Sequence, residues 1–181
     1  MNKIAVLGNS GGGKTTLSLA MASLLGIPCY SVDKAQWRPH WAPVPLDELA
    51  RTHGEWLAQS RWIIDGWGDV SLLRPRLEAA DTIILIEHAL WRHCWWALKR
   101  QCAGILFART DTPPGCAVLS SSWRLVRALR WGHRCGVPLA KQILSQMPDG
   151  GERRLHLLNS PRALNQFLAR LRADPPPRAP A

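Results

Sequence analysis

Short apolar runs that are typical of buried β-strands recur along the chain, at residues 4–7, 29–32, 62–64, 82–86 and 155–158. Between these runs, apolar residues return at intervals of three and four positions, which indicates amphipathic helices. Strands that alternate with helices are typical of a parallel sheet that is covered on both faces. The pattern therefore predicts an α/β fold with a five-stranded parallel sheet flanked by helices.

Two stretches interrupt the alternation of strands and helices. The second apolar run ends at Asp33, and the Trp- and Pro-rich segment that follows, up to Pro45, predicts irregular structure. Residues 102–120 are rich in turn-forming residues and predict a loop, with two further helical segments after it.

The C-terminal part carries clear signals for a last helix and its end. Ser160 followed by Pro161 predicts a helix start, because serine caps the first free N–H groups and proline fits the first helical position. The proline-rich residues 173–181 predict a disordered tail. We therefore expect one domain over residues 1–172.

A phosphate-binding motif follows the first apolar run of the chain. Gly8-Asn9-Ser10-Gly11-Gly12-Gly13-Lys14-Thr15 has the spacing of a P-loop, with an apolar run before it and a helical stripe after it. In this context backbone N–H groups turn inward around phosphate oxygens, and the helix N-terminus adds partial positive charge. Lys14 can reach the terminal phosphates of ATP, and the Thr15 hydroxyl can bind Mg²⁺.

Three acidic residues follow apolar runs, where ligands gather in parallel sheets. They are Asp33, Asp65 and Glu87. A P-loop enzyme needs one acid near Thr15 to hold Mg²⁺, and Asp65 is favoured because it ends an uninterrupted apolar strand, with Glu87 as the alternative. Asp33 is the candidate for taking a proton from an acceptor hydroxyl, or else it caps the segment that follows.

The charge of the chain is strongly positive, with a formal net charge of +10. Eight basic residues and one acid lie between Trp91 and Arg134, which gives 8 − 1 = +7 for that segment. Such a segment attracts nucleotide phosphates or nucleic acid. The five cysteines are scattered without metal-ligand spacing, and no membrane span or signal peptide is evident, so a reducing cytoplasm is the expected location.

Five segments, taken together, resemble a known family. GNSGGGKTTL, SVDKAQWRPHW, RWIIDG, RLEAADTIIL and RLHLLNSPRALNQFL, in this order, look like the adenylate-kinase-related P-loop proteins known as DNA topology modulation proteins. The resemblance covers residues 1–171. It implies a core of the nucleoside-monophosphate-kinase type with a basic helical lid at about residues 100–135.

The resemblance also implies roles for individual residues. Residues from Gly8 to Thr16 would bind ATP, and Asp65 would lie near Mg²⁺. Asp33 and the segment Trp37–Trp41 would border the acceptor, either by base stacking or by packing of the tryptophans on the core. On the helix that enters the lid, Arg92, Lys99 and Arg100 match the family's basic residues. The expected catalytic residues are Lys14, Asp33, Arg92 and Arg100.

One departure affects the acceptor side. After Asp65-Gly66 the chain has Trp67-Gly68, where adenylate kinases place an arginine that grips the acceptor phosphate, and the nearest arginines are Arg74 and Arg76. The resemblance favours a kinase that transfers phosphate from ATP to a small, nucleotide-like phosphate acceptor. The alternatives are a hydroxyl acceptor, an ATP-dependent regulator that binds nucleic acid weakly and without sequence preference, and a P-loop protein without an acceptor site.

Overall fold

The structure of the chain is a computed structural model that describes residues 1–106, 122–147 and 153–174, with only the helical backbone given for residues 100–106 and 122–124. The strands of the main sheet are β1 (Lys3–Gly8), β2 (Cys29–Ser31), β5 (Trp62–Asp65), β6 (Thr82–Ile86) and β7 (Arg154–Leu158). All neighbouring strands are parallel, in the order β2-β5-β1-β6-β7. The predicted five-stranded parallel sheet is therefore confirmed.

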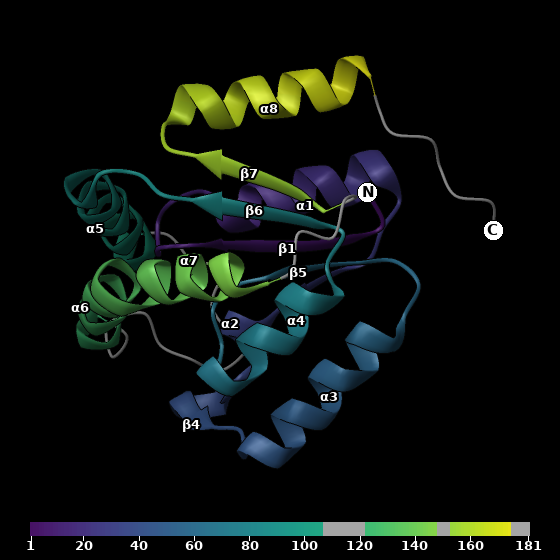
Figure 1. Cartoon of the computed structure of the whole chain (residues 1–181). Coiled ribbons are helices and arrows are strands. Elements are labelled where there is room, and N and C mark those ends of the chain that lie inside the picture. The colour runs from purple at the N-terminus through teal and green to yellow at the C-terminus, as the bar shows by residue number, and fades with distance from the viewer. Residues whose placement is uncertain (107–121, 148–152, 175–181) are drawn as a thin grey trace.

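Helices cover both faces of this sheet (Figure 1). The helices of the described chain are α1 (Lys14–Leu25), α2 (Val32–Ala35), α3 (Leu46–Ala58), α4 (Leu73–Ala79), α5 (Leu90–Leu106), α6 (Ser122–Trp131), α7 (Val137–Gln146) and α8 (Pro161–Ala173). A π-helical segment, Gly132–Gly136, joins α6 to α7 without a break. None of the described helices is long and apolar enough to cross a bilayer.

Two apolar clusters hold the helices to the sheet, because successive residues of a strand point to opposite faces. Ile4, Val6 and Ile84 pack with α1 and α8 on one face. Ala5 and Leu85 pack with α4 and α7 on the other. The central strands are buried on both faces, which explains why they appear in the sequence as continuous apolar runs.

The ends of α1 and α8 follow from local chemistry. Gly26 adopts a left-handed conformation (φ 62°) and its N–H bonds to the Ala22 carbonyl, which ends α1. At the start of α8, the Ser160 side chain accepts a hydrogen bond from the Ala163 N–H, with Pro161 in the first turn. The predicted cap of the last helix is thus confirmed.

Two expectations from the sequence were wrong. Strand β2 stops at Ser31 and the short helix α2 begins at Val32, so Asp33 lies in the first turn of a helix and not at a strand end. Helix α5 continues to Leu106, so the predicted loop does not begin at Cys102. Residues 107–120 of that predicted loop, the centre of the expected lid and the predicted tail from residue 175 lie outside the described residues.

The segment after α2 is more ordered than its composition predicts. The two-residue strands β3 (Trp37–Arg38) and β4 (Ala42–Pro43) pair antiparallel around a 3₁₀ turn, Pro39–Trp41. Within the turn, His40 and Trp41 have φ of 61° and 60°. This small hairpin lies beyond the end of α2, next to the start of α3 (Figure 1).

Candidate active site

The register of the sheet brings the motif residues together. Val6 of β1 pairs with Asp65 of β5, and Gly8 pairs with Ile86 of β6. A Cβ atom on Gly8 would lie 2.5 Å from the Ile86 carbonyl oxygen, so only glycine allows β1 to end this close to β6. The phosphate loop consequently starts at the carboxyl edge of the sheet, where Asp65 also lies.

The loop itself, residues 9–13, has the backbone of a phosphate cradle. Gly11 and Gly13 have φ of 76° and 85°, a left-handed conformation that favours glycine. The Gly12 N–H bonds to the Asn9 carbonyl and closes the turn. Helix α1 begins directly at Lys14, so its positive N-terminal end faces the loop.

Thr15 and Asp65, the two residues expected at Mg²⁺, are in contact. The Thr15 hydroxyl donates a hydrogen bond of 2.8 Å to Asp65 Oδ2. The other carboxylate oxygen, Oδ1, is buried and has no hydrogen-bond partner among the described residues. Burial raises the pKa of the Asp65 carboxyl, and Asp33 adds to this shift while Lys14 and the Thr15 hydrogen bond oppose it.

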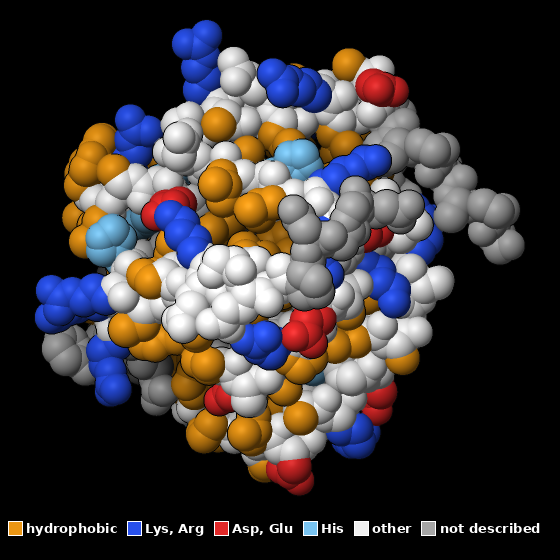
Figure 2. Space-filling view, in the orientation of Figure 1, with side chains coloured by type: hydrophobic (Ala, Val, Ile, Leu, Met, Phe, Trp, Pro, Cys, Tyr) orange, Lys and Arg blue, Asp and Glu red, His pale blue; other side chains and the backbone are white. Residues whose placement is uncertain are grey.

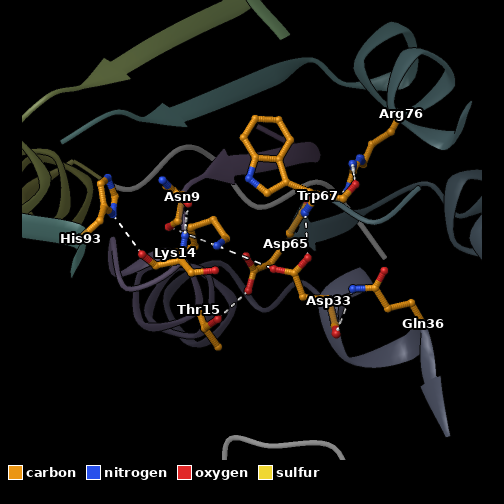
Figure 3. A network of polar contacts seen from close by, with 11 residues as sticks. Asn9, Lys14, Thr15, Asp33, Gln36, Asp65, Trp67, Arg76 and His93 are labelled. Atoms are coloured by element: carbon orange, nitrogen blue, oxygen red, sulfur yellow. Dashed lines mark hydrogen bonds and ion pairs between the residues drawn. The ribbon is translucent and has the colours of Figure 1, made fainter. Parts of the chain in front are cut away.

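Lys14 and Asp33 form the second contact of the site (Figure 3). Lys14 is 7% exposed, and its Nζ lies 3.7 Å from Asp33 Oδ2 and 3.4 Å from the Asn9 carbonyl oxygen. Asp33 Oδ1 accepts a hydrogen bond of 2.9 Å from the Trp67 N–H. Asp33 is therefore held beside the lysine that is expected at the terminal phosphates, and its side chain is 38% exposed.

Arg76 braces the turn that holds Asp33. Its side chain is fully buried, and its two terminal nitrogens donate 2.8 Å hydrogen bonds to the carbonyls of Gly66 and Trp67. Burial lowers the pKa of the guanidinium to about 10, while Asp33 and Asp65 favour its charged form. Arg76 thus supports the backbone of the site, and its guanidinium does not reach outward as an acceptor-binding group would.

Trp67 and Gly68 also have structural roles in this turn. The Trp67 ring is 8% exposed and makes an edge contact with Trp131, with 5.7 Å between ring centroids. A Cβ atom on Gly66 would lie 2.5 Å from Asp33 Cγ, and one on Gly68 would lie 2.2 Å from Val32 Cγ1. The two glycines therefore let the turn pass close to α2, which positions the Trp67 N–H on Asp33.

Glu87, the alternative metal residue, is engaged elsewhere. Its carboxylate forms a 2.6 Å ion pair with Lys141 of α7. The geometry thus favours Asp65, which contacts Thr15, as the acid for Mg²⁺. Among the described residues no group of three or more His, Cys, Asp or Glu side chains is placed to hold a metal ion. One carboxylate and one hydroxyl nevertheless suit Mg²⁺, which takes most of its remaining ligands from water and nucleotide phosphates.

The basic residues of the expected lid are described only in part. The Arg92 guanidinium lies over the Trp91 ring, 5.1 Å from its centroid, and the side chain of Arg100 lies outside the described part. On the following helix and the π-helical segment, Arg127, Arg130 and Arg134 are exposed. Figure 2 shows basic side chains projecting over α6 at the left edge of the molecule.

Sequence reasoning missed two contacts that join the phosphate loop to later helices. His93 Nδ1 of α5 lies 3.0 Å from the Ser10 carbonyl oxygen, and Asn9 Nδ2 donates a 2.9 Å hydrogen bond to the Leu129 carbonyl of α6. No spacing signal could have found them, because the partners lie 83 and 120 positions apart.

The sequence matches no protein-family model and no curated protein. Its structure, in contrast, resembles several solved kinases. Shikimate kinase from Acinetobacter baumannii, in complex with shikimate, is 14% identical with a TM-score of 0.58 over 94% of this chain and 90% of that one. A sugar kinase from Janibacter sp. HTCC2649 is 15% identical with a TM-score of 0.52, over 92% and 91%.

A second shikimate kinase, from Bacteroides thetaiotaomicron, is 13% identical with a TM-score of 0.51 over 94% of this chain and 95% of that chain. Likeness at this level of identity concerns the fold, and it spans nearly the whole of each protein. The narrower resemblance to DNA topology modulation proteins finds no support in these comparisons and stays a hypothesis. The chain has the α/β fold of the shikimate-kinase-like P-loop proteins.

Proposed function

We propose that the protein is a Mg²⁺-dependent kinase that transfers the terminal phosphoryl group of ATP to a hydroxyl group of a small molecule. The observation that carries this proposal is the position of Asp33, whose Oδ2 lies 3.7 Å from Lys14 Nζ. Lys14 follows the phosphate loop directly, so a carboxylate beside its ammonium group borders the place where the terminal phosphate would lie. The structural neighbours, two shikimate kinases and a sugar kinase, agree with this reaction class.

The charges around Asp33 support a hydroxyl acceptor. The family resemblance favours a phosphate acceptor, which needs cations to offset its charge next to a carboxylate. Arg76, one of the two arginines left for that purpose, is buried and bonded to two backbone carbonyls. The other, Arg74, pairs with Glu78 and Gln146 on the surface. An uncharged hydroxyl fits this environment better than a second phosphate.

Each residue of the site has its own role in the proposed transfer. Lys14 would offset the negative charge of the transferred group, and Thr15 and Asp65 would hold Mg²⁺, which supplies further positive charge there when bound. Asp33 takes the proton of the acceptor hydroxyl. The hydroxyl oxygen bonds to the terminal phosphorus of ATP while the bond from that phosphorus to the ADP oxygen breaks. The Trp67 N–H keeps the carboxylate oriented, since it binds the oxygen that does not face Lys14.

The direct test is a transfer assay with ATP, Mg²⁺ and two acceptor panels, one of polyols and hydroxy acids and one of nucleoside monophosphates. We expect phosphate esters from the first panel and a loss of about 100-fold or more in turnover for Asp33→Asn. Asp69→Asn is the matched control, because Asp69 caps the nearby 3₁₀ turn and lies on the surface. Transfer to nucleoside monophosphates that Asp33→Asn leaves intact would overturn the hydroxyl assignment.

A further inference from the structure

His93 places a buried imidazole directly against the phosphate loop. The side chain is 1% exposed, and its Nδ1 lies 3.0 Å from the Ser10 carbonyl oxygen (Figure 3). A carbonyl oxygen only accepts hydrogen bonds, so the contact requires the proton to sit on Nδ1. The bond joins helix α5 to the second residue of the loop.

This bond fixes one peptide group of the cradle. The Ser10 carbonyl and the Gly11 N–H belong to the same trans peptide, in which the two groups point in opposite directions. With the Ser10 oxygen bonded to His93, the Gly11 N–H points away from the His93 ring. Gly11 has a φ of 76°, so the loop turns sharply at this residue. An N–H group that is directed inward at such a turn would bind an oxyanion.

Steric contacts reinforce the same arrangement. A Cβ atom on Gly12 would lie 2.8 Å from His93 Cε1, and one on Gly11 would lie 3.1 Å from the His93 carbonyl oxygen. The imidazole therefore fills the space beside the loop, and the glycines let the loop approach it. On α6, the Leu129 carbonyl accepts the hydrogen bond from the Asn9 side chain, so a second helix fixes the residue before Ser10.

The electrostatic surroundings keep the imidazole neutral near pH 7. Burial lowers the pKa of His93 to about 4; the Ser10 carbonyl opposes this shift, whereas His88, Lys14 and His133 add to it. A neutral ring next to Lys14 leaves the charge of the phosphate site to the lysine and the metal. Its contribution is therefore geometric.

We propose that His93 is a positioning residue for ATP, which holds the Ser10–Gly11 peptide with its N–H group directed at a nucleotide phosphate before the nucleotide arrives. The proposal rests on the proposed function, because it assumes that the loop binds ATP. His93 contacts the loop backbone and acts on the phosphate only through it. Preorganised donors of this kind lower the cost of binding, since the loop does not have to be ordered by the ligand.

The test compares three variants by calorimetric titration with ATP and Mg²⁺ and by steady-state kinetics. His93→Leu removes the donor and keeps an apolar side chain, whereas His93→Asn keeps an N–H group at about the position of Nδ1. His53→Leu is the matched control, because His53 is also buried and has its pKa lowered to about 4 but lies on α3. We expect His93→Leu to raise the Kd and KM for ATP about tenfold and His93→Asn to restore most of the affinity.

Nuclear magnetic resonance of the imidazole nitrogens in the nucleotide-free protein gives a second readout. We expect a neutral ring with the proton on Nδ1; a proton on Nε2 would overturn the proposal. So would ATP affinity in His93→Leu equal to that of the wild type, or equal losses in His93→Leu and His93→Asn. A wild-type protein that binds no ATP would instead overturn the proposed function, and the tautomer would still decide whether His93 holds Ser10.

Discussion

The hydroxyl of Thr15 and the carboxylate of Asp65 lie 2.8 Å apart although 50 positions separate them in the sequence. One belongs to the first turn of α1 and the other ends β5, the neighbour of β1 in the sheet. The parallel pairing of β1 and β5 creates this contact, because it aligns the carboxyl ends of both strands. Within the described part of the chain the other oxygen, Oδ1 of Asp65, has no hydrogen-bond partner, so we expect it to bind a Mg²⁺ ion or a water on that ion.

Replacing Asp65 with Asn should weaken the metal site. We expect the Mg²⁺ concentration for half-maximal activity to rise about 10- to 100-fold, because a neutral amide holds the cation or its water less strongly. Glu87→Gln is the matched control, since Glu87 follows β6, the neighbour of β1 on the other side, but pairs with Lys141. Equal changes in the two variants, measured by titrating Mg²⁺ at saturating ATP, would contradict the assignment of Asp65.

Replacing Arg76 with Met should destabilise the fold. The change leaves the carbonyls of Gly66 and Trp67 without their donor and removes a buried positive charge near Asp33 and Asp65. We expect a loss of about 3–5 kcal/mol in the free energy of unfolding, measured by urea denaturation. Arg74→Met, two positions away on the surface, should cost less than about 1 kcal/mol. An Arg76→Met protein with an unchanged free energy of unfolding would mean that the hydrogen bonds from Arg76 do not stabilise this turn.

The stability of the protein should fall as the pH is lowered from about 6.5 toward 4. Burial lowers the pKa of His53 and of His93 to about 4, so between these limits the unfolded chain binds more protons than the folded one. Each histidine then contributes up to about 1.4 kcal/mol per pH unit to the slope. His53→Leu should reduce that slope by about 1 kcal/mol per pH unit, measured by denaturation at several pH values. An unchanged slope would show that His53 is protonated in the folded state.

Replacing Gly12 with Ala should weaken ATP binding, because the new side chain collides with His93. The new Cβ atom would lie 2.8 Å from His93 Cε1, while the backbone conformation of Gly12 is open to any residue. We expect the loss of affinity to shrink when His93→Ala is added, with a coupling of about 0.5–3 kcal/mol between the two changes. Additive losses in titrations of the single and double variants would show that the two side chains act independently.

The sheet and the phosphate loop could be predicted from the sequence because their signals are local. The runs Trp62–Ile64 and Thr82–Ile86 could be predicted as strands because strands that are buried on both faces appear as continuous apolar runs. The start of a helix at Lys14 could be predicted because the glycine-rich loop separates it from the strand before. The short helix α2 escaped prediction, since four residues carry no periodicity. The extension of α5 to Leu106 was missed because the stretch from Cys102 resembles a turn-rich loop.

The residues of the candidate site could be predicted only where a local sequence signal marks them. Lys14 and Thr15 belong to the P-loop, and Asp65 ends a strand next to it. Arg76 was considered only as one of the two arginines nearest to the acceptor side, because nothing local shows that its guanidinium binds the carbonyls of Gly66 and Trp67. His93 and Leu129 reach the loop through helix packing, which depends on the whole fold.

The most direct test of the proposed function is phosphoryl transfer from ATP, followed by ³¹P nuclear magnetic resonance, with the wild type, Lys14→Ala and Asp33→Asn. We expect the wild type to form a phosphate ester of a polyol or hydroxy acid, and both variants to form this product about 100-fold or more slowly while they stay folded. A wild type that transfers phosphate to no acceptor, or a Lys14→Ala variant that turns over like the wild type, would contradict the proposed function.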